Sequence, residues 1–326
     1  MAQPEVNTGI THPDLARTAE LLSPRPLAVI TGASRGIGAA IAAKFSLEGM
    51  VVIGNHSDGK KEERSRGVRT VIEEGGGVLQ VGDITTLEGR QNLTDAVDEK
   101  GGKLDVLVLN AASGSRELNV DANLALLSEM QDRMNPGGVV VFMQSIPSHF
   151  YPVVSGSFIP EYESVSSTKH EAERELRKKQ KELEEKGIKL LFVCPPEVPD
   201  TDIVRLFNMK HKDESKKSGE LSLKLGLPEN IMASDVAEKV FDLIQRKDEL
   251  PSGYIEFFNG AEDAQTALEK WYKPAQVGIQ TLEHVVRGSV AVGRSIISSA
   301  QVEGVKKLHM VDSFAADEGG SVIGNL

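Results

Sequence analysis

The sequence predicts an α/β fold: a doubly wound, mostly parallel sheet of seven strands with helices on both faces. Short apolar runs rich in β-branched residues alternate with longer amphipathic stretches as far as residue 260. A glycine loop separates the first of these runs from the first helical stretch. Because such alternation is typical of strands joined by crossover helices, residues 27–260 are expected to form one parallel-sheet domain.

Seven strands and six helices are expected along this domain. Each predicted strand is an apolar run too short for a helix, at residues 27–30, 50–54, 78–81, 104–109, 139–144, 189–193 and 254–258. The stretches between them predict helices over residues 39–48, 65–74, 87–99, 120–134, 166–185 and 234–246. The turn sequence NPGG at residues 135–138 is expected to end the fourth helix before the fifth strand begins.

Two further segments flank the domain. Residues 1–26 are polar and interrupted by proline, so they are interpreted as an N-terminal extension. Residues 261–326 are expected to form a helical C-terminal extension, with helices over 261–271 and 277–300. Its many aliphatic residues and Trp271 favour packing over exposure to water. The extension is therefore expected to be a lid beside the substrate cleft or an oligomer contact.

The composition limits the classes of partner. The chain has 326 residues, 40% of them hydrophobic, and a formal net charge of −11. This acidity argues against nucleic acid or an anionic membrane as partner, and no apolar run is long enough to span a membrane. The single cysteine, Cys194, excludes an internal disulfide and a cysteine-based metal cluster. With no secretory signal evident, a cytoplasmic protein that acts on small molecules without a metal is expected.

The loop after the first strand has the chemistry of a dinucleotide site. Gly32, Gly36 and Gly38 follow the strand in the pattern G-x3-G-x-G and open the next helix. In such a loop the first glycine permits a tight turn, the second lets the backbone approach a pyrophosphate, and the third allows helix and strand to pack closely. The helix N-terminus then faces the negative charge. Ser34 and Arg35 add a hydroxyl and a cation beside the phosphates.

The end of the second strand favours NADP(H) over NAD(H). An acidic residue at this point hydrogen-bonds the ribose of NAD and repels a 2′-phosphate. The sequence instead places Asn55 and His56 here, and Asp58 comes later. With the Arg35 cation nearby, NADP(H) is the expected cofactor.

Over residues 26–260 the sequence resembles the short-chain dehydrogenase/reductase superfamily, which has a Rossmann fold. The string TGASRGIG at residues 31–38 is similar to its cofactor signature, and Asp-Ile at 83–84 to its adenine-contacting pair. Residues 110–112 resemble its Asn-Asn-Ala-Gly element, and PPEVPDT at 195–201 resembles its segment near the nicotinamide. The resemblance implies a cofactor site made of Gly32, Ser34, Arg35, Gly36, Ile37, Gly38, Asn55, His56, Asp83, Ile84, Asn110, Ala111, Lys169, Pro195, Val198 and Thr201.

The resemblance also implies a set of catalytic residues. In that family a serine orients the substrate carbonyl, a tyrosine exchanges the proton, a lysine lowers the tyrosine pKa and holds the ribose, and an asparagine completes a proton relay. Ser145 resembles the serine, Lys169 the lysine and Asn119 the relay asparagine, with Asn123 as the rival for the last role. The chemistry is general acid catalysis by a phenol whose pKa an adjacent cation lowers.

The tyrosine departs from the family's commonest spacing. Val165 stands four residues before Lys169, where the tyrosine is usual. Tyr162 precedes the lysine by seven residues, a Tyr-x6-Lys spacing similar to the divergent branch that contains the enoyl-acyl-carrier-protein reductases. The glycine loop, by contrast, is of the common reductase type. Tyr162 is the expected proton donor, Tyr151 is the alternative, and a mechanism without a tyrosine stays open.

Three functions compete. The leading one is an NADPH-dependent oxidoreductase that reduces a carbonyl or enone of a small or acyl-linked substrate. The second, motivated by the displaced tyrosine, is a non-redox enzyme on this scaffold, such as a cyclase, isomerase or dehydratase. The third is an NADP(H)-binding pseudoenzyme. The helix over 166–185 resembles the element through which family members pair, which implies a homo-oligomer, either a dimer or a tetramer. His149, His170 and Cys194 are expected to be packing or surface residues.

Overall fold

Seven strands form one parallel sheet, as the sequence predicts. The computed structural model describes residues 24–57, 62–151, 160–212 and 231–258, so the expected C-terminal extension and most of the N-terminal one lie outside the described residues. The sheet has the order β3-β2-β1-β4-β5-β6-β7, and all neighbours are parallel. The strands are β1 (Leu27–Ile30), β2 (Val51–His56), β3 (Val78–Val81), β4 (Leu104–Leu109), β5 (Met134–Met143), β6 (Lys189–Cys194) and β7 (Ile255–Phe257).

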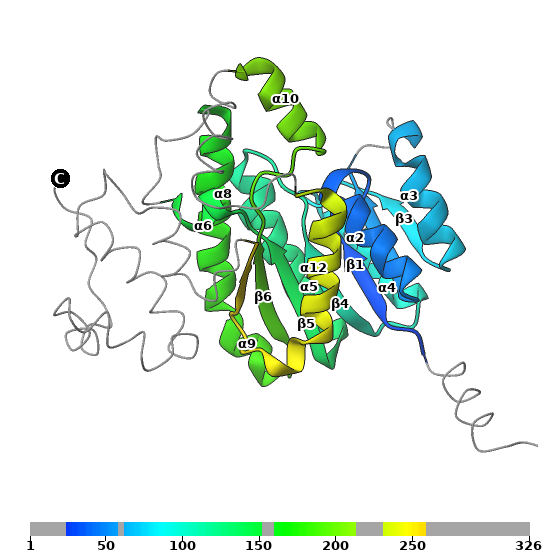
Figure 1. The fold of residues 1–326 in the computed structure, drawn as a ribbon. Helices are drawn as coiled ribbons and strands as arrows, with labels where there is room; N and C mark the ends of the chain where they lie inside the picture. Colours follow the sequence, from blue (N-terminus) through cyan, green and yellow to red (C-terminus); the bar gives the residue numbers. More distant parts are fainter. Residues whose placement is uncertain (1–23, 58–61, 152–159, 213–230, 259–326) are drawn as a thin grey trace, which may run out of the picture.

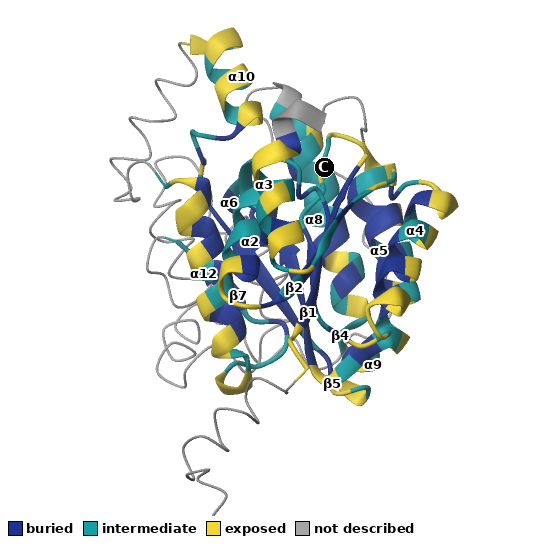
Figure 2. Ribbon diagram, turned by 90° about the vertical axis from the view of Figure 1, so that its right-hand side faces the viewer, coloured by how far each residue is buried: buried dark blue, intermediate teal, exposed yellow. Residues whose placement is uncertain are grey.

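Helices cover both faces of this sheet (Figures 1 and 2). Helices α2, α3 and α12 share one apolar core layer with the strands, and α4, α5 and α8 share the other. Their bounds are α2 (Gly36–Leu47), α3 (Glu62–Glu74), α4 (Leu87–Glu99), α5 (Asn123–Met130), α8 (Pro160–Lys178) and α12 (Ala233–Gln245). The expected doubly wound arrangement is confirmed.

The first strand shows why the apolar runs are continuous. Leu27 and Val29 belong to the core layer under α4, α5 and α8, whereas Ala28 and Ile30 belong to the layer under α2 and α12. All four side chains are at most 3% exposed. A strand buried on both faces has no polar side to alternate with, so its whole length is apolar.

Two boundaries near the candidate site differ from the sequence expectation. β2 continues to His56, because Asn55 and His56 pair with Gln80 and Val81 of β3. The helix expected from residue 166 begins at Pro160, where the missing N–H of proline costs nothing in a first turn. It then divides into α8 and a short α9 (Gln180–Glu185).

The fifth strand also begins earlier than expected, at Met134 rather than at residue 139. Met134 pairs with Leu104, and the register shifts before Val139 pairs with Val106. The NPGG turn lies within this irregular stretch, where Gly137 has a φ of 84°. The turn residues therefore follow the end of the helix, as expected, but the chain pairs with the sheet on both sides of them.

Four short elements of the described residues were not predicted. They are the π-helix η2 (Glu117–Ala122), the single-turn helix α6 (Ile146–His149), α10 (Asp202–Lys210) and the 3-10 helix η4 (Lys247–Glu249). Helix α10 has no buried residue and stands above the sheet edge (Figure 1). Among the described residues, no helix is long and apolar enough to cross a membrane.

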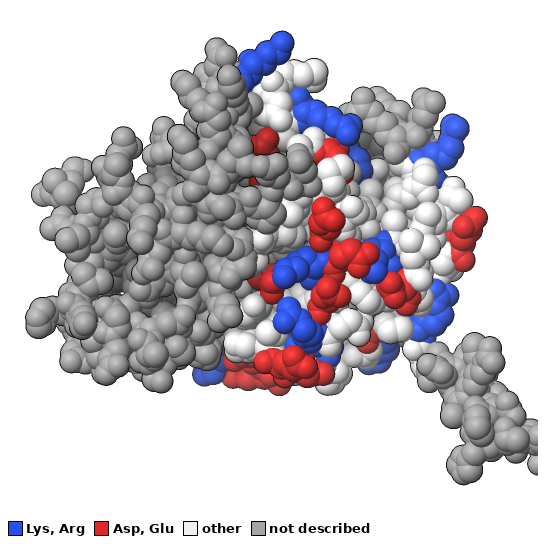
Figure 3. Space-filling model, viewed as in Figure 1, with Lys and Arg blue, Asp and Glu red and all other residues white. Residues whose placement is uncertain are grey.

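Acidic and basic side chains lie side by side over α2 and α12 (Figure 3). Lys44 of α2 pairs with Glu48 at 2.8 Å and with Glu238 of α12 at 2.6 Å. Surface pairs of this kind contribute at most about 1 kcal/mol. The two helices are therefore held together mainly by apolar packing, such as the edge-to-face contact of Phe45 and Phe241 at 5.8 Å.

Candidate active site

The carboxyl ends of all seven strands lie at one edge of the sheet, because the strands are parallel. At this edge β1 has β2 on one side and β4 on the other, which is the point where a doubly wound sheet opens a crevice for ligands. The glycine loop leaves β1 here, and the loops after β4, β5 and β6 meet it. The fold therefore brings the segments that carry the predicted cofactor and catalytic residues to one edge.

The glycine loop has no room for side chains at its turns. Gly32 and Gly36 have φ values of 69° and 54°, which glycine adopts without strain. A Cβ on Gly38 would lie 2.2 Å from the Gly32 carbonyl oxygen. A Cβ on Gly36 would lie 3.4 Å from Cγ2 of Thr201, so the loop after β6 lies directly against the glycine loop.

The N-terminus of α2 faces this crevice without a capping side chain. Arg35 is the N-cap and its side chain makes no capping hydrogen bond, and the first turn contains no acidic residue. The unpaired N–H groups and the positive end of the helix dipole favour an anion at this point. Ser34 and Ile37 flank it, both partly exposed. These residues fit the pyrophosphate of a dinucleotide.

Asn110, at the end of β4, holds the glycine loop in place. Its Nδ2 donates to the carbonyl oxygen of Thr31 at 2.9 Å. The Thr31 hydroxyl accepts the backbone N–H groups of Asn110 and Ala111, each at 2.9 Å. The Asn110 side chain therefore positions the loop.

The side chains of the residues predicted at the adenine end are buried or hydrogen-bonded within the protein. The Asn55 side chain is buried and donates to the Gly82 carbonyl oxygen at 2.8 Å. His56 is buried as well. The Asp83 carboxylate accepts the N–H of Thr85 at 3.0 Å, and Ile84 is part of the core.

Arg35, expected beside a 2′-phosphate, pairs with Asp202 at 3.3 Å. Both side chains are about half exposed, at 55% and 48%. The pair links the glycine loop to the start of α10 across the mouth of the crevice. The arginine is therefore at the surface of the cofactor crevice, held by a contact that solvent weakens.

The segment after β6 forms the opposite wall. The Pro195 carbonyl oxygen accepts the N–H of Ile146 at 3.3 Å, which joins this segment to α6. The Thr201 hydroxyl donates to the Val198 carbonyl oxygen at 2.8 Å, and both residues are buried. This wall therefore lies between the glycine loop and the candidate catalytic residues.

Tyr162 and Ser145 meet beside that wall. Tyr162 lies in the first turn of α8, and its hydroxyl donates to Ser145 Oγ at 3.0 Å. Ser145 follows β5 as the N-cap of α6. Burial raises the pKa of Tyr162, so the phenol holds its proton at neutral pH. The alternative tyrosine, Tyr151, instead packs its ring against His170 at 6.3 Å.

Lys169 lies two turns after Tyr162 on α8. Its Nζ donates to the Met143 carbonyl oxygen at 2.8 Å, at the end of β5. Burial lowers the pKa of Lys169 to about 8. An amine in this position has two further hydrogens to donate toward a ligand.

Asn119 lies buried in the π-helix η2, against α8. Its Nδ2 donates to the Thr168 hydroxyl at 2.7 Å and to the Ser113 carbonyl oxygen at 2.6 Å. The rival Asn123 donates to the Asn119 carbonyl oxygen at 2.9 Å. Asn119 thus contacts the residue next to Lys169, whereas Asn123 contacts its own helix. Extra-residue turns of this kind are frequent at functional sites.

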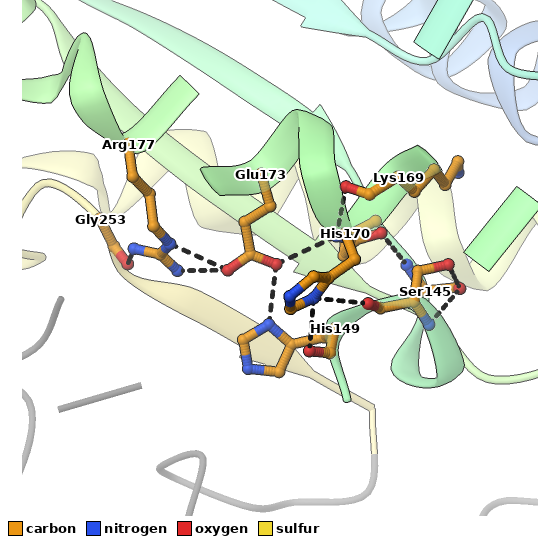
Figure 4. A network of polar contacts seen from close by, with 9 residues as sticks. Ser145, His149, Lys169, His170, Glu173, Arg177 and Gly253 are labelled. Carbon is orange, nitrogen blue, oxygen red and sulfur yellow. Dashed lines mark hydrogen bonds and ion pairs between the residues drawn. The ribbon is translucent and has the colours of Figure 1, made fainter. Parts of the chain in front are cut away.

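A buried carboxylate that the sequence analysis missed joins α8 to these residues. In Figure 4 Glu173 lies between His149 and Arg177. The distances to its oxygens are 2.8 Å from His149 Nδ1 and 2.7 Å from Arg177 Nη2. Burial opposes ionisation of Glu173, but the contacts with His149, Arg177 and Gln144 outweigh it and hold its pKa well below the usual value.

Gln144 connects this carboxylate to the candidate catalytic residues. Its Nε2 donates to Glu173 Oε2 at 3.0 Å and to the Lys169 carbonyl oxygen at 3.1 Å. Its Oε1 accepts the N–H of Ser145 at 3.2 Å. Neither Gln144 nor Glu173 belongs to a motif, so only their buried positions reveal them. Among the described residues, no group of three or more His, Cys, Asp or Glu is arranged to hold a metal ion.

A family model described as short chain dehydrogenase matches residues 26–212. The chain belongs to the short-chain dehydrogenase family. The matched range contains the glycine loop, Ser145, Tyr162 and Lys169. The sequence resemblance is therefore confirmed at the level of the family.

This short-chain dehydrogenase is similar to characterised relatives over part of their length. Tropinone reductase-like 3 from Erythroxylum coca is 32% identical over 143 residues, which are 39% of this chain and 55% of the relative. The chain thus matches about half the length of its curated relatives.

Solved structures share the fold more completely. A dehydrogenase/reductase from Sinorhizobium meliloti 1021 is 22% identical with a TM-score of 0.59, covering 76% of this chain and all of the other. A blue fluorescent protein from a metagenomic library, solved in complex with NADPH, is 22% identical with a TM-score of 0.60, covering 72% of this chain and 98% of the other. At these identities the similarity shows the fold alone.

Proposed function

We propose that the protein is an NADPH-dependent reductase that acts on a carbonyl or enone of a small or acyl-linked substrate, with Tyr162 as the proton donor. The observation that carries the proposal is the 3.0 Å hydrogen bond from the Tyr162 hydroxyl to Ser145 Oγ, at the same sheet edge as the glycine loop. The two residues come from α8 and from the end of β5, and the fold brings them together there.

The residues divide into those that hold the cofactor and those that act on the substrate. NADPH, when bound, supplies the hydride. The glycine loop and the N-terminus of α2 bind the pyrophosphate, and Lys169 Nζ binds the ribose hydroxyls. Ser145 donates a hydrogen bond to the substrate oxygen, and Tyr162 gives it a proton. Asn119 supports the start of α8 through its bond to Thr168.

Two features support NADPH over NADH. Arg35 is a cation at the mouth of the cofactor crevice, and the end of β2 carries no acid. A structural neighbour solved with NADPH has the same fold. Arg35 has to exchange Asp202 for the 2′-phosphate when the cofactor binds, which costs little because the pair is exposed.

The environment of Tyr162 supports an apolar substrate. The Phe207 ring of α10 meets the Tyr162 ring edge-on at 6.0 Å. Ile203 and Leu206 of the same helix are 52% and 40% exposed. An enone, a cyclic ketone or an acyl chain fits a phenol bordered by Phe207, on a helix that also exposes aliphatic side chains.

The assembly and the cellular setting are also proposals. A dimer or tetramer is expected to form through α8 and α9, by family resemblance. The single buried thiol, Cys194, suits a reducing compartment such as the cytoplasm.

The decisive experiment measures NADPH absorbance against a panel of ketones, enones and acyl thioesters. Substrate-dependent NADPH loss is expected for the wild type. It should fall at least about a hundredfold in Tyr162→Phe, with NADPH affinity retained, because a general acid contributes about that much. Tyr151→Phe is the control and is expected to keep its turnover.

The other outcomes select the competing functions. A Tyr151→Phe variant that loses turnover while Tyr162→Phe retains it transfers the role to Tyr151. Conversion of substrate with no loss of NADPH identifies a non-redox enzyme. Cofactor binding with no conversion of any panel member identifies a pseudoenzyme.

A further inference from the structure

The Gln144 side chain joins the two segments that carry the candidate catalytic residues. Gln144 follows β5 directly, and only 1% of its surface is exposed. Its Nε2 donates to the Lys169 carbonyl oxygen on α8 at 3.1 Å, and its Oε1 accepts the backbone N–H of Ser145 at 3.2 Å. One amide group therefore contacts the backbone of both the candidate serine and the candidate lysine.

Glu173 fixes the direction of this amide. Its carboxylate pairs with Arg177 at 2.7 Å, and an ionised carboxylate can only accept hydrogen bonds. Gln144 Nε2 donates to Glu173 Oε2 at 3.0 Å. A reversed amide would place its oxygen against this carboxylate and the Lys169 carbonyl oxygen, and its NH₂ group against the Ser145 N–H. All three hydrogen bonds would then be lost, so the carboxylate keeps Oε1 facing Ser145.

Ser145 is held from two directions. Its side chain is the N-cap of α6 and accepts the Ser148 N–H at 3.2 Å. Its own N–H is held by Gln144. The Ser145 Oγ between these two anchors accepts the Tyr162 hydroxyl at 3.0 Å. Loss of the Gln144 bond should therefore displace the Ser145 hydroxyl relative to the phenol without releasing it.

Lys169 is also attached to the end of β5 at two points. Its Nζ donates to the Met143 carbonyl oxygen at 2.8 Å, and its own carbonyl oxygen accepts from Gln144 Nε2. The first contact uses the amine that is proposed to bind the ribose. The second uses only backbone, so Gln144 holds this turn of α8 without taking a hydrogen from the amine.

The Gln144 side chain can be changed without removing its backbone contact. The Gln144 N–H donates to the Val193 carbonyl oxygen of β6 at 2.8 Å, a bond that any residue except proline can make. A variant at this position therefore tests the amide group.

We propose that Gln144 is a positioning residue, whose amide sets the place of the Ser145 hydroxyl relative to α8. It acts through the backbone of Ser145 and Lys169 and touches neither substrate nor cofactor. The inference rests on the proposed function, because Ser145 and the Tyr162 hydroxyl have to meet the substrate oxygen together.

The first test needs no substrate. Protein is labelled with ¹³C at the tyrosine ring carbon that bears the hydroxyl, and Tyr162→Phe assigns the signal. The chemical shift of this carbon responds to the hydrogen bond that the hydroxyl makes. Gln144→Met keeps the length of the side chain and removes its hydrogen bonds. It should move the Tyr162 signal in the same direction as Ser145→Ala, but less far, because α6 still holds the serine.

The second test uses turnover. Gln144→Met is expected to lower kcat by about tenfold, because a displacement of about 1 Å at a reacting group can cost about a hundredfold. The Kd for NADPH should stay nearly unchanged, since Lys169 Nζ keeps its bond to Met143. Gln144→Asn is a second variant with the same expected effects. It keeps an amide but is one methylene shorter, so its NH₂ group no longer reaches α8.

The matched control is Gln131→Met. Gln131 Nε2 donates to Glu182 Oε1 at 2.8 Å, so this amide also joins a glutamate on a neighbouring helix. It lies in the 3-10 helix η3 (Gln131–Arg133), before β5 begins, whereas the candidate site lies where β5 ends. The control should keep the wild-type Tyr162 signal and the wild-type kcat.

An unmoved Tyr162 signal in a folded Gln144→Met protein overturns the proposal, as does a kcat equal to that of the wild type. Equal losses in Gln144→Met and Gln131→Met also overturn it, because they indicate a general effect of losing an amide. If Gln144→Met does not fold, the same criteria apply to Gln144→Asn. The proposed function fails separately, if Tyr162→Phe keeps full turnover. The NMR measurement still tests in that case whether Gln144 sets the contact between Ser145 and the phenol.

Discussion

Lys169 carries a charge that its surroundings disfavour. Its amine donates to the Met143 carbonyl oxygen, but no carboxylate pairs with it among the described residues. Its pKa falls to about 8, below the value of about 10.4 in an unfolded chain. The folded state therefore binds this proton less tightly than the unfolded state. The lysine costs stability below about pH 8, and the cost disappears as the pH rises to about 10.4.

Lys169→Met is accordingly expected to stabilise the protein while damaging the site. The free energy of unfolding at pH 7 should rise by about 1–3 kcal/mol, because a disfavoured buried charge is replaced by a side chain of similar length. NADPH affinity and turnover should fall, since the proposed ribose contact is lost. Urea unfolding at pH 7 and pH 10 measures the first effect, and fluorescence titration measures the second.

The gain in stability should be smaller at pH 10 than at pH 7. Equal stability of the wild type and the variant at both pH values contradicts the pKa shift. A less stable variant would indicate instead that the bond to Met143 contributes more than burial costs.

Residues that belong to a recognisable motif can be predicted from the sequence. Residues that matter through their contacts in the folded protein cannot be predicted in this way. Ser145, Tyr162 and Lys169 were predicted from the family resemblance, and the structure places the first two in contact. Glu173 was not predicted, because a buried glutamate has no distinctive pattern in one sequence. Its contacts depend on how α6 packs against α8, which the sequence pattern does not encode.

Glu173 is one of the residues that attach helix α8 to the rest of the fold. The carboxylate meets Arg177 on its own helix, His149 on α6 and Gln144 at the end of β5. Arg177 in turn lies over the Phe192 ring at 4.2 Å and donates to the Gly253 carbonyl oxygen. One charged side chain therefore connects two helices and one strand.

Glu173→Gln is expected to lower the free energy of unfolding by about 3–5 kcal/mol at pH 7, because it leaves the buried Arg177 charge without its partner. Since the Glu173 pKa is depressed in the folded state, its contribution is present above about pH 4.3 and is lost as the pH falls further. Urea unfolding of both proteins at pH 7 and pH 3 checks this, and the difference should narrow at pH 3.

Glu256→Gln is the matched control for the effect on the site. Glu256 is also buried and paired with two cations, Lys239 and Arg246, but it lies in β7 and, within the described residues, makes no hydrogen bond to the candidate catalytic residues. Both variants should lose stability, and only Glu173→Gln should also lose turnover under conditions where it is folded. An equal loss of turnover in both would show that the network acts through stability alone.

The sequence predicts strands better than helix ends. Each of the seven strands overlaps its predicted apolar run, because burial on both faces leaves a signal without interruption, although β5 begins at Met134, five residues before its run. The start of α8 was placed six residues late, since Pro160 and Glu161 belong to a polar stretch that does not show a helical period. Helix α10 was not predicted, although Ile203, Leu206 and Phe207 lie at helical spacing in the sequence, and none of its residues is buried.

Two residues that are far apart in the chain form an ion pair at the mouth of the candidate cofactor crevice. Arg35 belongs to the first βα unit, and Asp202 opens α10 after the sixth strand. Arg35→Ala is expected to weaken NADPH binding about tenfold or more and to leave NADH binding nearly unchanged, because only NADPH carries the 2′-phosphate. Asp202→Ala should strengthen NADPH binding several-fold, since the arginine no longer has to exchange a partner. Fluorescence titration with both cofactors measures these affinities.

The preference for NADPH over NADH should shrink as ionic strength rises. The reason is that the proposed contact between Arg35 and the 2′-phosphate is exposed to solvent and is screened by salt. Equal affinities of the wild type for the two cofactors, or an Arg35→Ala protein that binds NADPH as well as the wild type, would remove Arg35 from the cofactor site.

The architecture of the described sheet and its helices was predictable because it follows from the alternation of strands and helices. The Tyr-x6-Lys spacing predicted less than the alternation did. The position of the Tyr162 hydroxyl depends on how α6 packs against α8, and the spacing does not determine that packing. The family match supports the reductase class. The choice of substrate depends on the elements that line the site, such as α10, whose positions were not predicted from the sequence.

The contact of Asn110 with Thr31 has a consequence for the order of folding. The two residues are 79 positions apart, and their hydrogen bonds hold the glycine loop. Closing so long a stretch of chain is slow and entropically costly. A fragment that contains β1, the glycine loop and α2 but lacks β4 should therefore bind no nucleotide, although it carries the whole signature. During refolding, the change in NADPH fluorescence that accompanies binding should appear only after β1 and β4 have paired. The time course of NADPH binding therefore reports when the centre of the sheet forms.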